Sequence, residues 1–373
     1  MATSERLLAL DVMRGLTISG MILVNNPGTW GEIYAPLRHA VWNGLTPTDL
    51  VFPFFVFMMG VAMYISLKKF CFRLDGTLLK KVFRRTTVIF LIGIAIHALS
   101  NFLWGFHGGG WTEAFSSLKE VRVLGVLQRL ALCYGISSLI VTTCRHCLLP
   151  YIIGGLLTVY ALVLMLGDGF VYGPENILSR VDRAVIGLTH MYNDRSIEPE
   201  GLLSTLPSIA HVLIGFCIGK ICVEEKDMNA KLVRLFVWGI QLTLGGWLLS
   251  YACPINKKVW SPTFVLVTCG LACLLLGLLL VCIDVKKSWR RTSFFQVFGV
   301  NPLFCYVLSQ VFAILAGYPF VGDVSLHHML YDDMLCNLFG DGKFASLLYA
   351  LFTVSVVWMA GFYLYRKKIY IKI

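Results

Sequence analysis

Charge is scarce in this chain. Only 14% of its 373 residues are Asp, Glu, Lys or Arg, whereas about a quarter of a typical soluble domain is charged. Hydrophobic residues make up 57%, and the mean hydropathy is +0.74. Apolar runs recur along the whole length, and roughly 20 apolar residues are enough for one helix to span a bilayer. The composition therefore argues against a soluble domain and predicts an all-α integral membrane protein, a polytopic helical bundle.

Other features are also absent. No internal repeat and no low-complexity tract stands out. Cys144 and Cys147 have the spacing of half a zinc site, but no second pair follows nearby, so we expect no metal. The first apolar run has no basic leader and no small-residue cleavage site. We therefore expect it to be a retained span and not a signal peptide.

Ten apolar segments can be read from the sequence, which predicts about ten transmembrane helices. An even number places both termini on the same side of the membrane. The segments are residues 7–24, 49–67, 86–104, 123–143, 149–167, 206–222, 233–251, 262–283, 299–317 and 345–365.

The basic residues indicate which side that is. A net charge of +11 would suggest nucleic acid in a soluble protein, but cytoplasmic loops of membrane proteins carry an excess of Lys and Arg. With the N-terminus inside, 21 Lys and Arg lie in inner segments and 9 in outer ones. This split predicts that both termini are cytoplasmic and that residues 25–48 face outward. We expect a membrane lipid environment and no nucleic acid.

The loops divide the chain unequally between the two faces. Three long outer segments are expected at 25–48, 168–205 and 318–344, and the basic segment 68–85 is expected in the cytoplasm. This distribution favours a polar substrate handled on the outer side. We predict a first five-helix half (1–167), a long outer loop (168–205) and a second five-helix half (206–373).

The outer loop 25–48 holds a single histidine, His39, among tryptophans and glycines. An imidazole has a reference pKa near 6.5, so it can take a proton from an amine or a hydroxyl, or briefly carry an acyl group. A structural hydrogen bond from a surface histidine is the alternative. Trp30 and Trp42 suit a membrane interface, and they equally suit stacking against a sugar ring.

Two polar residues flank this loop. Asn25 closes the first apolar run, either simply ending a helix or donating a hydrogen bond to a developing oxyanion. Thr46, Pro47 and Asp49 form a Thr-x-x-Asp capping box with proline at the first helical position. Asp49 is explained equally well as this cap and as part of a catalytic site.

Charges within apolar runs are functional candidates. Asp11 and Arg14 are spaced to neutralise each other on one helix face. Arg129 falls in the outer half of the fourth span, where Asp49 is a candidate partner at comparable depth. A role for Arg129 in binding an anionic or carbonyl group is the alternative. Gln128, Asn301 and Gln310 can line a tunnel or link helices, and the 68–85 segment can bind a phosphate-rich cofactor.

Seven stretches of the sequence, taken together, carry a further signal. They are LDVMRGLTISGMILVNN, HAVWNGLTPTDLVFPFFVFMMG, GVLQRLALCYG, VDRAVIGLTHMY, PEGLLSTLPSIAHVLIG, PINKKVWSPTFVL and GVNPLFCYVLS. In this order, from about residue 6 to 310, they resemble the transmembrane heparan-α-glucosaminide N-acetyltransferase family. One departure is Glu198-Pro-Glu where the family has Asp-Pro-Glu. The chain resembles a compact bacterial form, so we expect it to lack the additional N-terminal luminal part of the animal enzyme.

The resemblance implies an enzyme that takes acetyl-CoA from the cytoplasm and acetylates the amine of a terminal glucosamine on the other side of the membrane. It places the catalytic histidine at His39 and an active-site asparagine at Asn25. Asp49, Trp42, Asn43 and Arg129 are expected to support the substrate or the transition state. The residues expected near acetyl-CoA are Arg84, Arg85, Gln128, Arg129 and Asn301.

We therefore expect a membrane-embedded acyltransferase of the bacterial inner membrane, with His39 facing the periplasm. Its acceptor would be an amino sugar or a heparan-type oligosaccharide, and a homodimer is left open. Two alternative functions are consistent with the same sequence features: an O-acetyltransferase of a cell-envelope glycan and a secondary transporter. A lipid-interacting protein without turnover is a further alternative.

Overall fold

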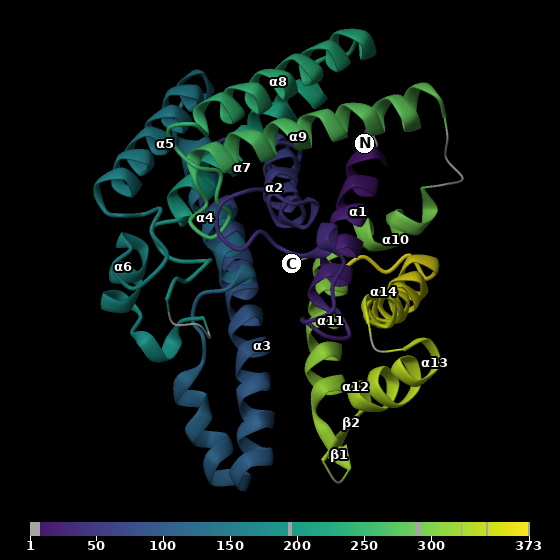
Figure 1. Cartoon of the computed structure of the whole chain (residues 1–373). Helices are drawn as coiled ribbons and strands as arrows, with labels where there is room; N and C mark the ends of the chain where they lie inside the picture. The colour runs from purple at the N-terminus through teal and green to yellow at the C-terminus, as the bar shows by residue number, and fades with distance from the viewer. Residues whose placement is uncertain (1–7, 193–195, 288–291, 322, 341, 372–373) are drawn as a thin grey trace.

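The computed structural model describes residues 8–192, 196–287, 292–321, 323–340 and 342–371. Several of the basic residues counted above lie outside the described residues: Arg6, Arg195, Arg290, Arg291 and Lys372. Within the described residues, nine helices are long and apolar enough to cross a membrane, and a bent helix pair brings the number to ten. The predicted all-α polytopic bundle of about ten spans is confirmed (Figure 1).

The long helices match the predicted segments in order, and most of them also match closely in extent. They are α1 (Leu8–Asn25), α2 (Val51–Lys68), α3 (Gly76–Ser117), α4 (Val126–Thr143), α5 (Leu149–Leu166), α7 (Thr205–Glu224), α8 (Met228–Leu249), α9 (Pro262–Leu280), α11 (Pro302–Gly317) and α14 (Lys343–Arg366). Short helices α6 (Ile177–Val185), α10 (Ser293–Val300), α12 (Leu326–His328) and α13 (Asn337–Phe339) join them, with a small hairpin of β1 (Pro319–Val321) and β2 (Val324–Ser325). Single turns and π-helical segments complete the chain: Ala35–Leu37, Pro47–Leu50, Leu118–Glu120, His146–Leu148, Leu188–His190, Val281–Val285 and Met329–Cys336.

Two spans differ from the expected segments. The loop expected at 68–85 ends at Asp75, whose carboxylate accepts a hydrogen bond from Leu78 N at 2.6 Å and so caps α3. Lys80, Lys81, Arg84 and Arg85 therefore lie on the first turns of a helix. The expected 299–317 span is instead the pair α10 and α11, bent by 86° at Asn301. Proline at position 302 suits the first turn of the second helix.

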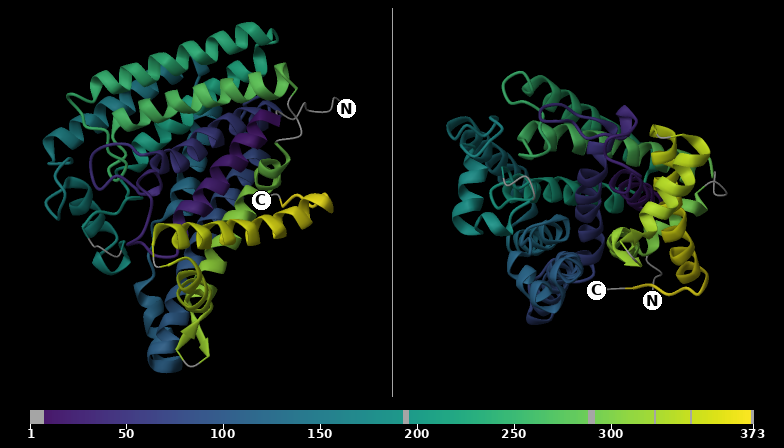
Figure 2. Two further views of the ribbon diagram at one scale, coloured as in Figure 1. Left: turned by 45° about the vertical axis from the view of Figure 1, so that its right-hand side comes forward. Right: turned by 60° about the horizontal axis from the view of Figure 1, so that its bottom comes forward.

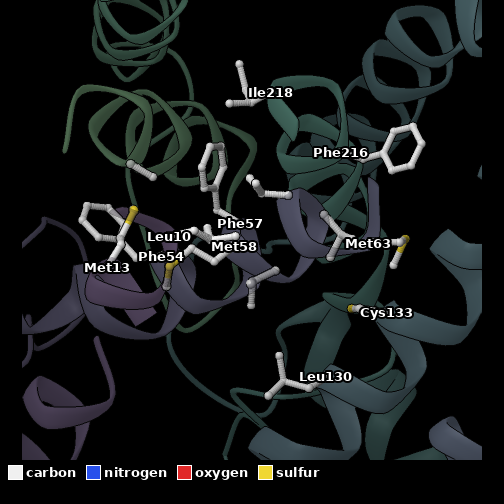
Figure 3. Packing of buried hydrophobic residues seen from close by; sticks show 14 of the residues in the cluster. Leu10, Met13, Phe54, Phe57, Met58, Met63, Leu130, Cys133, Phe216 and Ile218 are labelled. Carbon is white, nitrogen blue, oxygen red and sulfur yellow. The ribbon is translucent and has the colours of Figure 1, made fainter. Parts of the chain in front are cut away.

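The centre of the bundle is formed by α1, α2, α7 and α9, most of whose residues are buried, whereas few residues of α3, α5 and α8 are buried. Leu10, Phe57, Met58 and Phe216 are among the core residues where these central helices meet (Figure 3). α2 packs mainly on α7, so helices from the two predicted halves pack together at the core. The division into two five-helix halves stays a prediction.

The segments expected on the outer side gather at one end of the bundle. Loop 26–46 contacts three of them: Gly44 N donates to Ile255 O at 2.8 Å, Trp42 Nε1 donates to Phe170 O at 2.7 Å, and His327 Nε2 lies 2.9 Å from Gly28 O. Figure 2 shows the start of α1 and the end of α14 toward the opposite side. The common end agrees with the charge-based topology; which face of a membrane it occupies stays a prediction.

Close helix crossing at the core depends on glycine. A Cβ on Gly60 of α2 would lie 2.1 Å from the Val212 backbone oxygen of α7, and one on Gly215 of α7 would lie 2.1 Å from the Phe57 oxygen. Small residues at such positions let two helix backbones approach. The α2–α7 contact therefore has no room for a larger side chain.

Gly60→Ala is expected to lower stability by about 1–3 kcal/mol, because the added methyl group meets backbone atoms that cannot rotate away. Gly154→Ala is the matched control, since a Cβ there meets nothing within 4 Å. The apparent melting temperature in detergent, followed by size-exclusion chromatography, measures the difference. Equal melting temperatures for the two variants would contradict the close-packed crossing.

Candidate active site

Loop 26–46 ends in a capped turn. Thr46 and Asp49 form the predicted capping box around the turn Pro47–Leu50 that leads into α2. Asp49 Oδ2 accepts hydrogen bonds from Thr46 N at 3.1 Å and from Thr46 Oγ1 at 2.9 Å. The side chain of Asp49 is 1% exposed, so the cap fixes a buried carboxylate under the loop.

The same carboxylate holds His39. Asp49 Oδ1 lies 2.7 Å from His39 Nδ1, and Asp49 Oδ2 also accepts from Ala40 N at 3.1 Å. An ionised carboxylate can only accept, so the hydrogen of the neutral imidazole sits on Nδ1 and Nε2 carries the lone pair. Within the described chain Nε2 makes no hydrogen bond. A histidine oriented in this way can act as a general base.

His39 lies beside a hollow. Its side chain is 38% exposed and lines a cavity of about 410 Å³ together with Trp30, Gly31, Ile33 and Arg38. Trp30 is 65% exposed, and Arg38 donates to Gly31 O at 3.2 Å. The hollow thus combines an exposed aromatic face, a cation and the imidazole.

Lys257 is a site residue that sequence reasoning missed. Its Nζ lies 3.1 Å from His39 Nδ1 and 3.4 Å from Asp49 Oδ1. Burial lowers the pKa of Lys257 below its usual value, and the nearby Asp49 and Glu200 carboxylates oppose that shift. The sequence showed only an outer loop with two lysines, and 218 positions separate Lys257 from His39.

Trp42 and Asn43, both predicted to support the site, attach the loop to its neighbours. Asn256 Nδ2 donates to Asn43 Oδ1 at 3.0 Å, and this bond connects the loop to the turn that carries Lys257. Trp42 Nε1 donates to Phe170 O, and its ring meets the edge of Tyr172 at 5.1 Å. These contacts position the loop.

The predicted pairing of Arg129 with Asp49 is wrong. Arg129 is 1% exposed; its guanidinium donates to Ser204 Oγ and, at 3.3 Å, to Gly201 O, and it stacks over the Trp260 ring at 5.1 Å. It therefore binds the start of α7, while His39 and Lys257 occupy Asp49. By contrast, the predicted pair of Asp11 and Arg14 is confirmed at 3.2 Å.

The second predicted catalytic residue, Asn25, is the last residue of α1 and is partly buried. Its carboxamide makes no hydrogen bond to the described residues. The neighbouring Asn26 is different: its Nδ2 donates to Ile22 O at 2.7 Å and is buried. Asn26 thus caps the end of α1, and the Asn25 carboxamide is left available beside the loop.

The residues predicted near acetyl-CoA fall into two groups. Along α3 and α4, Arg84 is exposed, Arg85 stacks over Tyr134 at 4.6 Å, and Gln128 is fully buried. Neither polar atom of the Gln128 side chain, nor Arg85 Nε, has a hydrogen-bond partner among the described residues. Where α3 packs against α4, these donors and acceptors are therefore left without partners in the described chain.

Asn301 belongs to the other group. Its Nδ2 donates to Ile369 O at 2.9 Å and its Oδ1 accepts from Ile371 N at 2.9 Å, so it fastens the segment after α14 to the α10–α11 bend. Its carboxamide is thus engaged with the chain itself. No group of three or more potential metal ligands is found among the described residues.

A buried charge cluster, also missed by sequence reasoning, lies near the site. Arg122 donates to Glu198 Oε2 at 3.2 Å and to Glu200 Oε2 at 2.7 Å. Burial alone would lower the pKa of Arg122, but Glu200 and Glu198 raise it above its usual range. Glu198 is fully buried, so the Glu-Pro-Glu departure keeps a carboxylate at this ion pair.

Comparison with known proteins agrees with this arrangement. Residues 6–252 match the family model described as heparan-alpha-glucosaminide N-acetyltransferase, catalytic. The chain belongs to this family.

Two relatives from the same family carry the name heparan-alpha-glucosaminide N-acetyltransferase. The proteins of Mus musculus and Homo sapiens are each 28% identical to the chain over 96% of its length. The alignments cover 61% and 60% of these relatives, so the chain spans about three fifths of their length. The family is named for an acyltransferase, and its matched region includes His39, Asn25 and Asp49 but ends before Lys257.

Asp182 is a buried carboxylate whose ionisation makes the stability of the fold depend on pH. It is fully buried, Oδ1 accepts from Leu202 N at 2.9 Å, and Oδ2 has no hydrogen-bond partner among the described residues. Burial raises the pKa of Asp182 to about 6, while the Leu202 N–H lowers it and Glu198 raises it further. A group whose pKa is raised by folding favours the folded state in its protonated form.

The contribution of Asp182 to stability is therefore full below about pH 4 and is lost as the pH rises through 6, by up to about 3 kcal/mol. Asp182→Asn keeps an acceptor for Leu202 without the charge, so its melting temperature is expected to fall less than that of the wild type between pH 4.5 and 7.5. Thermal melts across this range measure the difference. Parallel curves for the two proteins would show that Asp182 does not ionise with a raised pKa.

Proposed function

We propose that this protein is a membrane-embedded N-acetyltransferase that moves acetyl from cytoplasmic acetyl-CoA to the amine of a terminal glucosamine on the outer face. The observation that carries the proposal is the pair of His39 and Asp49 at 2.7 Å beside an open hollow. Membership of the family supports the acetyl donor and the amino-sugar acceptor. An exposed tryptophan in the hollow suits a sugar ring, which offers an apolar face for stacking.

In this mechanism His39 Nε2 accepts the proton of the attacking amine as the new N–C bond forms to the acetyl carbon. The Asn25 carboxamide donates to the oxygen of the tetrahedral intermediate. When the C–S bond breaks, the imidazolium returns the proton to the departing thiolate, which leaves as the thiol. In a two-step variant His39 carries the acetyl group before the amine attacks. Acetyl trapped on His39 without acceptor would favour two steps.

The route for the coenzyme follows α3 and α4. Arg84 and Arg85 would hold its phosphates near the inner end of α3, and Gln128 would meet the pantetheine arm further out. Gly93, which lies against Gln128, is eight residues along α3 from Arg85, a distance of about 12 Å at 1.5 Å per residue. Asn301, engaged with residues 369–371, would take part only after releasing that segment.

His39→Ala is expected to lower the rate of acetyl-CoA-dependent acetylation of glucosamine by about 10²- to 10⁴-fold, because it removes the general base. The matched control is His328→Ala: this histidine also contacts an aspartate, Asp332, at 2.8 Å, but it is exposed. Thiol release dependent on acceptor measures the rate, and product mass with alkali stability distinguishes an amide from an ester. A folded His39→Ala protein that keeps wild-type activity would refute the assignment.

Vesicle experiments separate this function from transport. An enzyme releases thiol only when donor and acceptor are both present, whereas a secondary transporter accumulates substrate without acetyl-CoA. We expect no such accumulation in vesicles that contain this protein alone.

A further inference from the structure

Lys257 contacts both His39 and Asp49. Its ammonium is within 3.1 Å of His39 Nδ1 and 3.4 Å of Asp49 Oδ1, and its side chain is 25% exposed. It lies beyond residue 252, where the family model match ends. The proposed mechanism uses His39, Asp49 and Asn25 and gives this cation no part.

A carboxylate beside an imidazole has two opposing effects. Asp49 holds the ring in one tautomer, which aids catalysis, but its negative charge also stabilises the imidazolium. An imidazolium has no lone pair and cannot accept the amine proton. A nearby cation counters the second effect, because it disfavours a second positive charge on the ring.

We propose that Lys257 is a positioning residue that balances the charge of Asp49, so that His39 stays neutral with its hydrogen on Nδ1 and its lone pair on Nε2. Lys257 acts through the positive charge of its ammonium and transfers no proton. This inference deepens the proposed function and rests on it for its catalytic meaning, although the state of His39 itself can be measured without turnover.

The surrounding charges agree with this role. Around His39 and Lys257 the charged groups are Asp49 beneath the ring, Arg38 in the wall of the hollow and Glu200 from the segment before α7. Glu200 is itself bound to Arg122 at 2.7 Å, so part of its charge is already compensated. Asp49 is therefore the carboxylate in direct contact with both His39 and Lys257.

The backbone holds Lys257 in place. Lys257 O accepts from Trp260 N at 3.1 Å, and Asn256 Oδ1 accepts from Val259 N at 3.1 Å, closing a tight turn. Trp260 has φ +52°, in the left-handed region, and is buried at 1% exposure beneath the Arg129 guanidinium. A large residue keeps such a conformation only where its surroundings enforce it. Arg129 thus supports the turn that carries the cation.

The first test is the titration of the His39 ring by NMR, assigned by its absence in His39→Gln. Lys257→Met is expected to move the midpoint of this titration up by about one pH unit, because a unit charge within 4 Å is removed. Lys257→Arg is expected to keep it near the wild-type midpoint. The control is Lys258→Met, since Lys258 instead lies over the Tyr172 ring at 4.9 Å. An unchanged midpoint in Lys257→Met would overturn the proposal.

The second test is the pH profile of kcat/KM for acetyl transfer. In Lys257→Met the acidic limb is expected to shift upward by the same amount, with about tenfold less activity on that limb and recovery at alkaline pH. A loss that is equal at every pH would indicate a purely structural role and overturn the proposal. If Lys257→Met does not fold, Lys257→Gln takes its place in both tests.

Different outcomes would refute the proposed function and the role of Lys257. Full activity of His39→Ala would refute the proposed function and leave the NMR shift intact. An inactive His39→Ala together with an unshifted His39 titration in Lys257→Met would refute only the role of Lys257.

Discussion

The site depends on one buried carboxylate. Asp49 is 1% exposed and receives hydrogen bonds from Ala40 N, Thr46 N, Thr46 Oγ1 and His39 Nδ1, with the Lys257 ammonium beside it. Burying a carboxylate is costly unless its oxygens are paired, and here the partners come from the loop, the first turn before α2 and a distant turn after α8. Placing this charge requires all three segments to meet, so the fold and the orientation of His39 are determined together.

The helix cap and the support of His39 are therefore provided by the same residue, Asp49. Sequence reasoning treated them as alternatives for Asp49, since a Thr-x-x-Asp box explains an aspartate at the start of a helix completely. In the structure Oδ2 serves the cap while Oδ1 contacts His39. A carboxylate has two oxygens with room for several donors, and a single residue can thus end a loop and orient its histidine.

Features formed by residues close together in the sequence could be predicted, whereas contacts between distant residues could not. The spans followed from runs of apolar residues, and the pair of Asp11 and Arg14 from a spacing of three, since both are local. Lys257 could not be placed, because its contact with His39 exists only once α8 and α9 bring its turn to the loop. The partner of Arg129 could not be predicted either, because it also comes from a distant part of the chain. Similar depth in the membrane suggested Asp49, but Arg129 lies against Ser204 and Trp260. The 86° bend at Asn301 lies where α10 packs on α1, which is likewise a contact between segments far apart in the chain.

The central claim is that Asp49 acts through His39. A double-mutant cycle in acetyl transfer, with His39→Ala, Asp49→Asn and the two combined, tests it most directly, using only variants whose melting temperatures show that they are folded. If Asp49 works by orienting His39, the combined variant is no slower than His39→Ala alone, because the carboxylate has nothing left to orient. If the double variant instead loses rate by the product of the two single losses, the claim that Asp49 acts through His39 is contradicted.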